Sequence, residues 1–264
     1  MPRFPEETLD YITDFLHDNP EALRQIRLAS RSRDARARML LFRHVDFKCP
    51  RDLNNWSKIF QQGPENFPAL HTRSVCFRYT TFTSEDLRWI WSFKHVQRLE
   101  IWNLKLGYNS CLLYNFLDPF HKFSPTLKSL TVGWKSARPK EIFRLVHSFP
   151  LLEDLHLVAY NHTCRNRDVV TSQPPDLPVF IRTLVLDAVS SWFVGELLKP
   201  RKLCRFQRIV WRPVQIGRQS RYSANTVNIL VKKCSGTLEF IDVEFGWSCK
   251  SYSLAPCLWA IFSI

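Results

Sequence analysis

Glycine is scarce in this chain, with 7 residues out of 264. That scarcity excludes collagen-like and other low-complexity architectures, and it argues against glycine-rich phosphate-binding loops. The sequence contains no dinucleotide-binding fingerprint, no P-loop pattern and no G-x-S-x-G turn of the kind that presents a nucleophilic serine. We therefore identify no catalytic motif, and we expect a protein that is not an enzyme.

Closely spaced cysteines are also missing. The 8 cysteines are dispersed, and no two of them have the C-x-x-C spacing of zinc fingers and RING domains. The 8 histidines likewise fall at no metal-ligand spacing. We expect no metal and no other cofactor. The cysteines are interpreted as reduced, mostly buried thiols of a cytoplasmic or nuclear protein.

Long apolar runs are absent too. Residues 1–18 are rich in acidic side chains and lack the continuous apolar region of a signal peptide. The longest apolar stretch, residues 254–264, is about half as long as a membrane-spanning helix and contains Pro256. We expect no membrane association. The tail, residues 251–264, also lacks the polar cap that usually ends a repeat array, so it is either an unusual ending or a truncated reading frame.

The composition that remains is that of a folded chain with an excess of positive charge. Hydrophobic residues make up 45% of the sequence and include 9 Trp and 20 Phe, which excludes disorder as the dominant state. The formal net charge of +13 invites a nucleic-acid function. Residues 1–48 carry a net charge of only +1, however, so the other residues contribute +12. The charge excess therefore belongs to the C-terminal part of the chain.

Residues 1–48 have the apolar spacing of three short helices. Leu9, Ile12 and Leu16 recur at helical intervals, with Tyr11 and Phe15 beside them. Further along, an Asn-Pro pair at residues 19–20 predicts the start of a second helix, and a serine at position 30 or 32 is suited to cap a third. A module this small buries little apolar surface alone, so we expect it to need a partner or a neighbouring domain.

After Pro50 the pattern changes to short strands that alternate with short helices. An aliphatic residue followed two positions later by another apolar residue recurs with first positions 75, 99, 130, 155, 184, 209 and 241. The steps of 24, 31, 25, 29, 25 and 32 residues are typical of leucine-rich repeats with modest insertions. Helices are predicted between these strands over residues 84–93, 110–117, 139–149, 191–198 and 224–234.

The predicted fold is α/β: a short three-helix module followed by a leucine-rich-repeat-like solenoid of parallel strands alternating with helices. Stacking such units buries a continuous core and lines a concave sheet with the strands. An ordinary α/β domain with coincidental strand spacing is the alternative. We predict a helical module over residues 1–48, a linker over 49–72, the solenoid over 73–250 and the apolar tail over 251–264.

The N-terminal module resembles the F-box, in particular the form that precedes leucine-rich-repeat-like regions in many fungal proteins. The residues that carry the resemblance are Phe4, Pro5, Glu6, Glu7, Leu9, Ile12, Phe15, Leu16, His17, Asp18, Ala22, Leu23, Leu28, Ala29, Ser30, Arg31, Ser32, Ala37, Arg38, Leu41, Phe42 and Arg43. Phe4 stands where the family usually has Leu, and Arg33 stands where it commonly has Trp.

The resemblance implies a role in protein ubiquitination. F-box helices bind a Skp-family adaptor, which links them to a cullin-RING ligase, while the C-terminal domain holds a protein substrate. The adaptor-binding residues that the resemblance implies here are Phe4, Pro5, Leu9, Ile12, Phe15, Leu16, Leu23 and Leu28. For Leu9, Ile12 and Leu16, packing against one another within the module is an equally good interpretation.

The substrate would be held by the repeat array. Basic residues recur at or beside the predicted strands, and aromatic residues with arginine supply much of the binding energy of protein interfaces. We expect an acidic or phosphorylated protein substrate. The candidate contact residues are Trp102, Trp134, His156 and Trp211. His156 lies between two strand leucines and is expected on the concave face, where an ordinary surface histidine is the simpler interpretation.

Two other functions remain open. In the first, the F-box is degenerate and the array is a protein-interaction scaffold that works independently of ubiquitin. In the second, the basic array binds nucleic acid, which we regard as the weaker hypothesis because no element has the spacing of a groove-reading motif. Association with a Skp-family adaptor separates the first hypothesis from the proposed receptor, and tight salt-dependent binding to DNA or RNA would favour the second.

Overall fold

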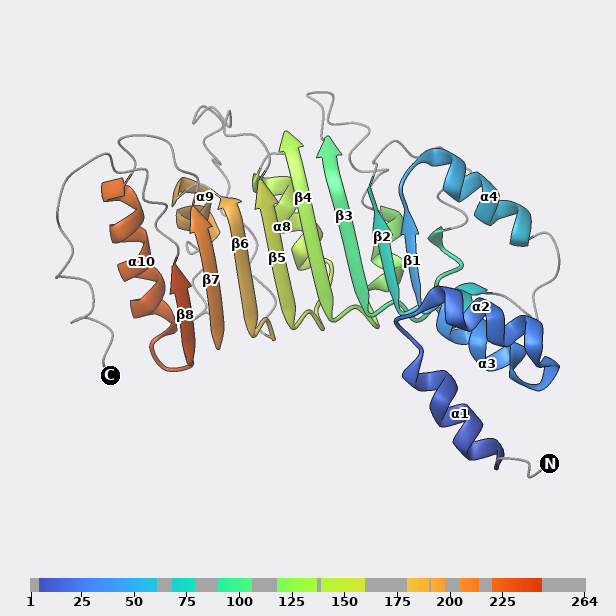
Figure 1. Ribbon diagram of the computed structural model, residues 1–264. Coiled ribbons are helices and arrows are strands. Elements are labelled where there is room, and N and C mark those ends of the chain that lie inside the picture. Colours follow the sequence, from blue (N-terminus) through green and yellow to red (C-terminus); the bar gives the residue numbers. More distant parts are fainter. Residues whose placement is uncertain are drawn as a thin grey trace, which may run out of the picture.

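The protein has an α/β fold built on one sheet of eight parallel strands (Figure 1). The strands lie side by side in the order β1 to β8, which is their order in the sequence, and helices alternate with them. This arrangement is compatible with the predicted solenoid. The computed structural model describes residues 5–60, 68–78, 90–105, 118–136, 139–159, 180–189, 191–197, 205–213 and 220–243.

The elements have the following bounds. The strands are β1 His44–Phe47, β2 Ser74–Phe77, β3 Arg98–Lys105, β4 Ser129–Ser136, β5 Asp154–Ala159, β6 Thr183–Val189, β7 Arg208–Pro213 and β8 Phe240–Val243. The helices are α1 Glu6–Phe15, α2 Pro20–Ala29, α3 Arg31–Leu41, α4 Pro50–Phe60, α5 Pro68–His71, α8 Pro139–His147, α9 Ser191–Leu197 and α10 Ser220–Cys234, with a 3-10 helix, η1, over Asp118–Phe123.

The predicted strands are confirmed. All seven of the apolar pairs that begin at positions 75, 99, 130, 155, 184, 209 and 241 lie within β2 to β8. The helices predicted over 139–149, 191–198 and 224–234 correspond to α8, α9 and α10. Residues 84–89 and 110–117, which belong to the other two predicted helices, lie outside the described residues. None of the helices in the described part of the chain is long and apolar enough to cross a membrane.

The sheet begins earlier than the sequence interpretation placed it. Residues 1–48 were predicted to be helical throughout, but β1 pairs in parallel with β2 and forms the first strand of the sheet. Val45 and Phe47 are buried in the same core as the later strands, since they repeat the same aliphatic-x-apolar pattern. The N-terminal helices therefore end at α3, and the sheet starts at β1.

The described residues of the predicted linker over 49–72 contribute to the core of the sheet. They include α4 and α5, and Leu53, Trp56 and Ala69 from these helices are buried in the main core. The Trp56 ring lies edge-on to Phe47, with 5.7 Å between ring centroids. The described part of this connecting segment therefore contributes apolar side chains to the core beside the first strands of the sheet.

The main core lies between the sheet and the helices on one of its faces. Two rows of side chains run across the strands at paired positions, and both are buried in β1 to β7. One row is Val45, Val75, Leu99, Leu130, Leu155, Leu184 and Ile209, and the other is Phe47, Phe77, Ile101, Val132, Leu157, Leu186 and Trp211. Figure 1 shows α8 behind the strands, and Ile142, Phe143 and Val146 from this helix complete the core. Alternation along each strand directs the intervening residues to the opposite face, which we call the open face.

A repeated hydrogen-bond pattern joins each strand to the preceding one. The backbone N–H groups of Arg73 and Ser74 both donate to the Arg43 carbonyl oxygen, at 2.9 and 3.0 Å. The same pair of hydrogen bonds to one carbonyl oxygen recurs at the start of each strand from β2 to β8. Threonine hydroxyls add to it, because Thr72 donates to the Phe42 carbonyl oxygen and Thr126 donates to that of Val96. These bonds satisfy the turn backbone at the edge where the strands begin.

Candidate functional site

The three N-terminal helices form a small module with a core of its own. Leu23, Ala37 and Leu40 are buried together, separately from the main core. The start of α2 follows the predicted chemistry, since Pro20 is its first residue and the Asn19 side-chain oxygen accepts a hydrogen bond from the Ala22 backbone N–H at 3.0 Å. A core this small buries little apolar surface by itself.

Charged side chains tie the helices of the module together. Arg36 of α3 donates hydrogen bonds to Asp14 and Asp10 of α1, at 2.8 and 3.0 Å. Asp34 accepts hydrogen bonds from Arg27 of α2 and from Arg38, at 2.7 and 2.6 Å. Arg36 of the third helix therefore neutralises two carboxylates of the acidic first helix across their interface.

The hydrogen bond from Arg36 lowers the pKa of Asp14 below its ordinary value. A carboxyl with a lowered pKa stabilises the fold at neutral pH, and this contribution disappears as the pH falls through the lowered pKa. In Arg36→Gln we expect the Asp14 pKa to rise toward its ordinary value and the module to become only slightly less stable, since both side chains are more than one third exposed. Carboxyl NMR titration measures the pKa. Arg24→Gln is the control, because its partner Glu21 lies in the same helix, and an unchanged Asp14 pKa in Arg36→Gln would contradict the expectation.

The exposed side of α1 is apolar. Tyr11 is 73% exposed, Ile12 45% and Phe15 77%, and their spacing places them on one side of the helix. The opposite side, with Thr13 fully buried and Leu16 packed on the module core, faces the neighbouring helices. A helix that keeps three large apolar side chains in water is typical of a docking surface.

The other predicted adaptor-binding residues are placed as follows. Pro5 is exposed immediately before α1, Leu9 is half-buried, and Leu28 of α2 is 82% exposed. Phe4 lies outside the described residues. Leu23 is fully buried in the module core, so the structure corrects its predicted role: it supports the helices and presents no surface to a partner.

Two of the predicted substrate contacts are core residues. Trp134 is 2% exposed and Trp211 is fully buried, and the Trp211 indole N–H donates to the Val189 carbonyl oxygen at 3.2 Å. Predicting these side chains on a recognition surface was wrong. The alternation of strands already placed them in the core, because Trp134 is two residues after Val132 and Trp211 is two residues after Ile209, and all four share one face.

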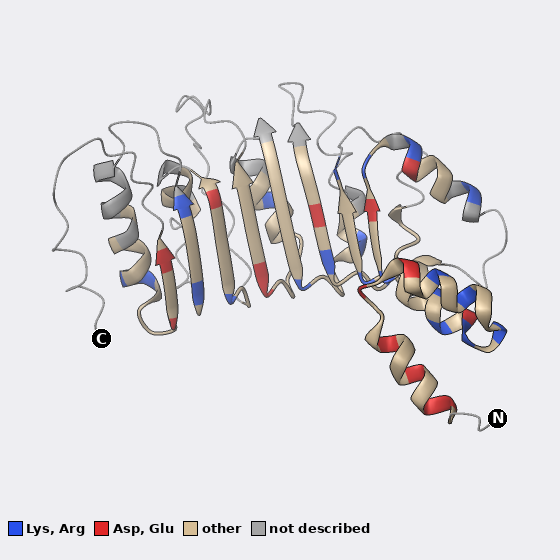
Figure 2. Cartoon of the chain, in the orientation of Figure 1, with Lys and Arg blue, Asp and Glu red and all other residues tan. Residues whose placement is uncertain are grey.

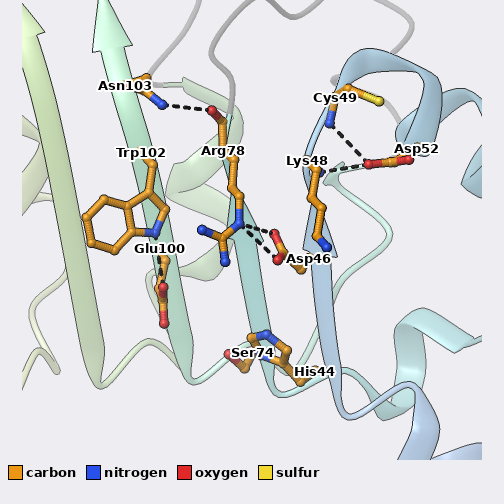
Figure 3. Close-up of polar contacts among 10 residues, drawn as sticks. All are labelled: His44, Asp46, Lys48, Cys49, Asp52, Ser74, Arg78, Glu100, Trp102 and Asn103. Carbon is orange, nitrogen blue, oxygen red and sulfur yellow. Dashed lines mark hydrogen bonds and ion pairs between the residues drawn. The ribbon is translucent and has the colours of Figure 1, made fainter. Parts of the chain in front are cut away.

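The other two predicted contacts lie on the open face. Trp102 is half-buried there, and its indole N–H donates to Glu100 at 3.1 Å (Figure 3). His156 is also half-buried, and its Nε2 lies 2.6 Å from a carboxylate oxygen of Asp187. The other oxygen of Asp187 accepts a hydrogen bond from Arg212 at 3.0 Å. Sequence reasoning missed Asp187 as a member of this cluster, since its partners come from β5 and β7.

A second polar cluster occupies the open face near β1 and β2. Arg78 donates from its Nε to both oxygens of Asp46, at 3.1 and 3.0 Å (Figure 3). The Asn103 side chain donates to the Arg78 carbonyl oxygen at 3.2 Å. Asn103 has a φ of 59°, a left-handed conformation that asparagine tolerates, and it lies where the register between β3 and β4 shifts. The open face is thus polar at both of these clusters and can offer hydrogen bonds to a partner.

Cys76 lies between the carboxylates of this face and is 1% exposed. Burial, with further contributions from Asp46 and Glu100, raises the pKa of its thiol to about 12. At mildly alkaline pH we expect Cys76 to react with iodoacetamide at least about 1,000-fold more slowly than an ordinary thiol, whereas the exposed Cys49 is alkylated readily. Mass spectrometry of the folded protein measures both rates. The unfolded chain is the control, and equal rates at both cysteines in the folded chain would contradict the burial of Cys76.

Neither surface has the composition of a metal centre. Within the described ranges, no three His, Cys, Asp or Glu side chains gather closely enough to hold a metal ion. No known protein family, curated protein or solved structure matches the chain. The functional interpretation therefore depends on the residues and the surfaces themselves.

Proposed function

We propose that this protein is the substrate-recognition subunit of an SCF-type ubiquitin ligase, in which an N-terminal F-box binds a Skp-family adaptor and a leucine-rich-repeat-like array binds a protein substrate. The observation that carries the proposal is the apolar side of α1. Tyr11, Ile12 and Phe15 are exposed on a module that resembles the F-box, and Ile12 and Phe15 are among the residues that carry the resemblance. The adaptor connects this module to a cullin-RING ligase.

The energetics of the exposed side of α1 support a protein partner. Burying a large apolar side chain contributes about 1.5–3 kcal/mol, so leaving three of them in water forgoes a substantial gain. Amphipathic helices that bind in apolar grooves use anchors at intervals of three and four residues, the spacing that separates Phe15 from Ile12 and Tyr11. The buried side of α1 packs against the rest of the module. Adaptor binding and packing within the module are therefore roles for different faces of the same helix.

A receptor also needs a second surface at a distance from the first. In Figure 1, α1 extends away from the sheet, and the strands lie to one side of the module. A partner on the apolar side of α1 would therefore leave the sheet accessible to a substrate. The chain supplies no chemistry of its own in this role, since ubiquitin transfer belongs to the other subunits. We place the activity in the cytoplasm, the nucleus or both, where cullin-RING ligases act.

Co-expression with a Skp-family adaptor tests the proposal. We expect the full chain and the adaptor to elute as one complex in size-exclusion chromatography. The adaptor should also increase the solubility of the chain, because it covers apolar surface. If a folded chain elutes separately from the adaptor, the receptor function fails, and the ubiquitin-independent scaffold becomes the better hypothesis.

A further inference from the structure

The charges of the sheet are segregated between its open face and the edge at which the strands begin. The edge comprises the last residue before each strand and the first residue of the strand. Its six cations are Arg43, Arg73, Arg98, Lys128, Arg182 and Arg208, and its three acids are Glu153, Asp154 and Glu239, which gives a net charge of +3. Farther along the strands, the charged side chains that the structure describes on the open face are Asp46, Glu100, Asp187 and Asp242 against Arg78 and Arg212, which gives −2.

We infer that this edge, which we call the basic edge, binds an extended acidic segment of a protein partner. The inference deepens the proposed function, on which it rests for the identification of the partner as the substrate. Figure 2 shows basic residues at the lower ends of several strands. The contact residues predicted from the sequence, Trp102, Trp134, His156 and Trp211, lie on the open face or in the core, whereas the net positive charge lies at the edge.

The cations of the basic edge differ in how much they are already neutralised. Lys128 lies 2.9 Å from Glu153 and is paired. Arg98, in contrast, is exposed between Ser74 and Ser129 of the neighbouring strands, with no acidic residue paired to it in the register. Arg208 lies over the Phe240 ring at 5.0 Å, which orients the guanidinium while its N–H groups remain able to donate. Arg182 is exposed too, and the carboxylate near it, Glu153, is already bonded to Lys128. Arg98, Arg182 and Arg208 are therefore the main candidates to contact an anion.

The spacing of the basic edge fits an extended polypeptide. Parallel strands are about 4.8 Å apart, so the path from Arg73 on β2 to Arg208 on β7 covers about 24 Å. An extended peptide rises about 3.3 Å per residue, and about seven residues span that distance. Carboxylates at every second or third position of such a segment can each meet an arginine of the edge.

The acids of the basic edge favour a protein over a nucleic acid. Glu153 and Asp154 interrupt the row of cations between Lys128 and Arg182. A nucleic acid carries a phosphate at every residue and would place negative charge against these carboxylates. A polypeptide can carry neutral residues opposite Glu153 and Asp154. These two acids would then fix the position of the peptide along the edge.

The test uses the purified full chain and a fluorescent glutamate-rich peptide of about eight residues, long enough for the predicted span. Fluorescence anisotropy should detect binding that weakens as ionic strength rises. We expect Arg98→Glu with Arg182→Glu to lower the affinity about tenfold, because two attractive contacts become repulsive. Thermal unfolding by circular dichroism checks that the variant keeps its fold.

A matched variant makes the same change in net charge elsewhere. Arg51 and Lys58 are exposed on α4, which lies at the opposite end of β1 in Figure 1, and we expect Arg51→Glu with Lys58→Glu to change the affinity less than about twofold. Equal losses in both variants, or no peptide binding by the wild-type chain, would overturn the inference. Tighter binding of a single-stranded oligonucleotide, lost on reversal of the edge, would overturn it in favour of nucleic acid.

This result is independent of adaptor binding. The Arg98 and Arg182 variant should still associate with a Skp-family adaptor, since its substitutions leave α1 unchanged. A chain that binds the acidic peptide but no adaptor would retain the basic edge as an interaction surface and remove the ligase interpretation. A chain that binds the adaptor but no acidic peptide would retain the ligase interpretation and overturn the basic edge as a binding surface.

Discussion

Replacing Trp211 with alanine will lower the free energy of unfolding by about 3–5 kcal/mol, the range typical of large aromatic residues removed from a core. Trp211 is fully buried in β7 and continues the row of core side chains that includes Leu186 of the adjacent strand. Its indole N–H also donates to the Val189 carbonyl oxygen, which the substitution leaves without that donor. Urea unfolding followed by far-ultraviolet circular dichroism measures the loss.

Trp102→Ala is the matched control for this substitution. Trp102 also lies in a strand of the sheet, and its indole N–H also donates a hydrogen bond. It differs in being half-buried on the open face and in donating to a side chain, Glu100, instead of a backbone carbonyl. We expect Trp102→Ala to cost less than about 1.5 kcal/mol. If the two variants unfolded at the same urea concentration, the assignment of Trp211 to the core and Trp102 to the surface would be wrong.

The combination of Ile12→Glu with Phe15→Glu is expected to lower the affinity for a Skp-family adaptor by about 100-fold or more. Large apolar residues at the centre of an interface each contribute on the order of 2 kcal/mol, and every 1.4 kcal/mol is a factor of ten. Both side chains are exposed in the free chain, so the fold should tolerate glutamate at these positions. Surface plasmon resonance with immobilised adaptor measures the affinity.

Leu151→Glu provides the comparison for this loss of affinity. Leu151 is 45% exposed, the same fraction as Ile12, and it precedes β5 in the array. We expect it to bind the adaptor like the wild-type chain. Leu23→Ala distinguishes support from contact, because a buried leucine replaced by alanine costs about 2–5 kcal/mol and should unfold the module before it alters any interface. Wild-type affinity in the Ile12 and Phe15 variant would exclude the apolar side of α1 as the contact.

The strand positions were readable from the sequence because one pattern recurs with each repeat. A pair of apolar residues flanking a polar or small one places both side chains in the core, and this was sufficient to locate β2 to β8. The same pattern at Val45 and Phe47 was passed over, since the residues before it are helical and the module was taken to continue through them. Local context therefore hid the first strand, although its own signal was as strong as that of the others.

The functional surfaces were harder to predict because they depend on what neighbouring elements cover. On α1, hydrophobicity alone favoured Leu9, Ile12 and Leu16 as one face, yet the buried position between them is Thr13. A threonine can be buried there because its hydroxyl donates to the Leu9 carbonyl oxygen at 2.8 Å, which satisfies its polar group within the helix. This rotates the exposed apolar side toward Tyr11 and Phe15. The sequence showed that basic residues recur beside the strands, but their alignment into one basic edge depends on the register between the strands.

The order of the strands has a consequence for how this chain is made. Each described strand pairs only with the strands immediately before and after it in the sequence. As the chain leaves the ribosome, every strand after β1 therefore meets one partner that has already been synthesised. The sheet can grow one repeat at a time behind the N-terminal helices, with a single unpaired growing edge at each stage of synthesis.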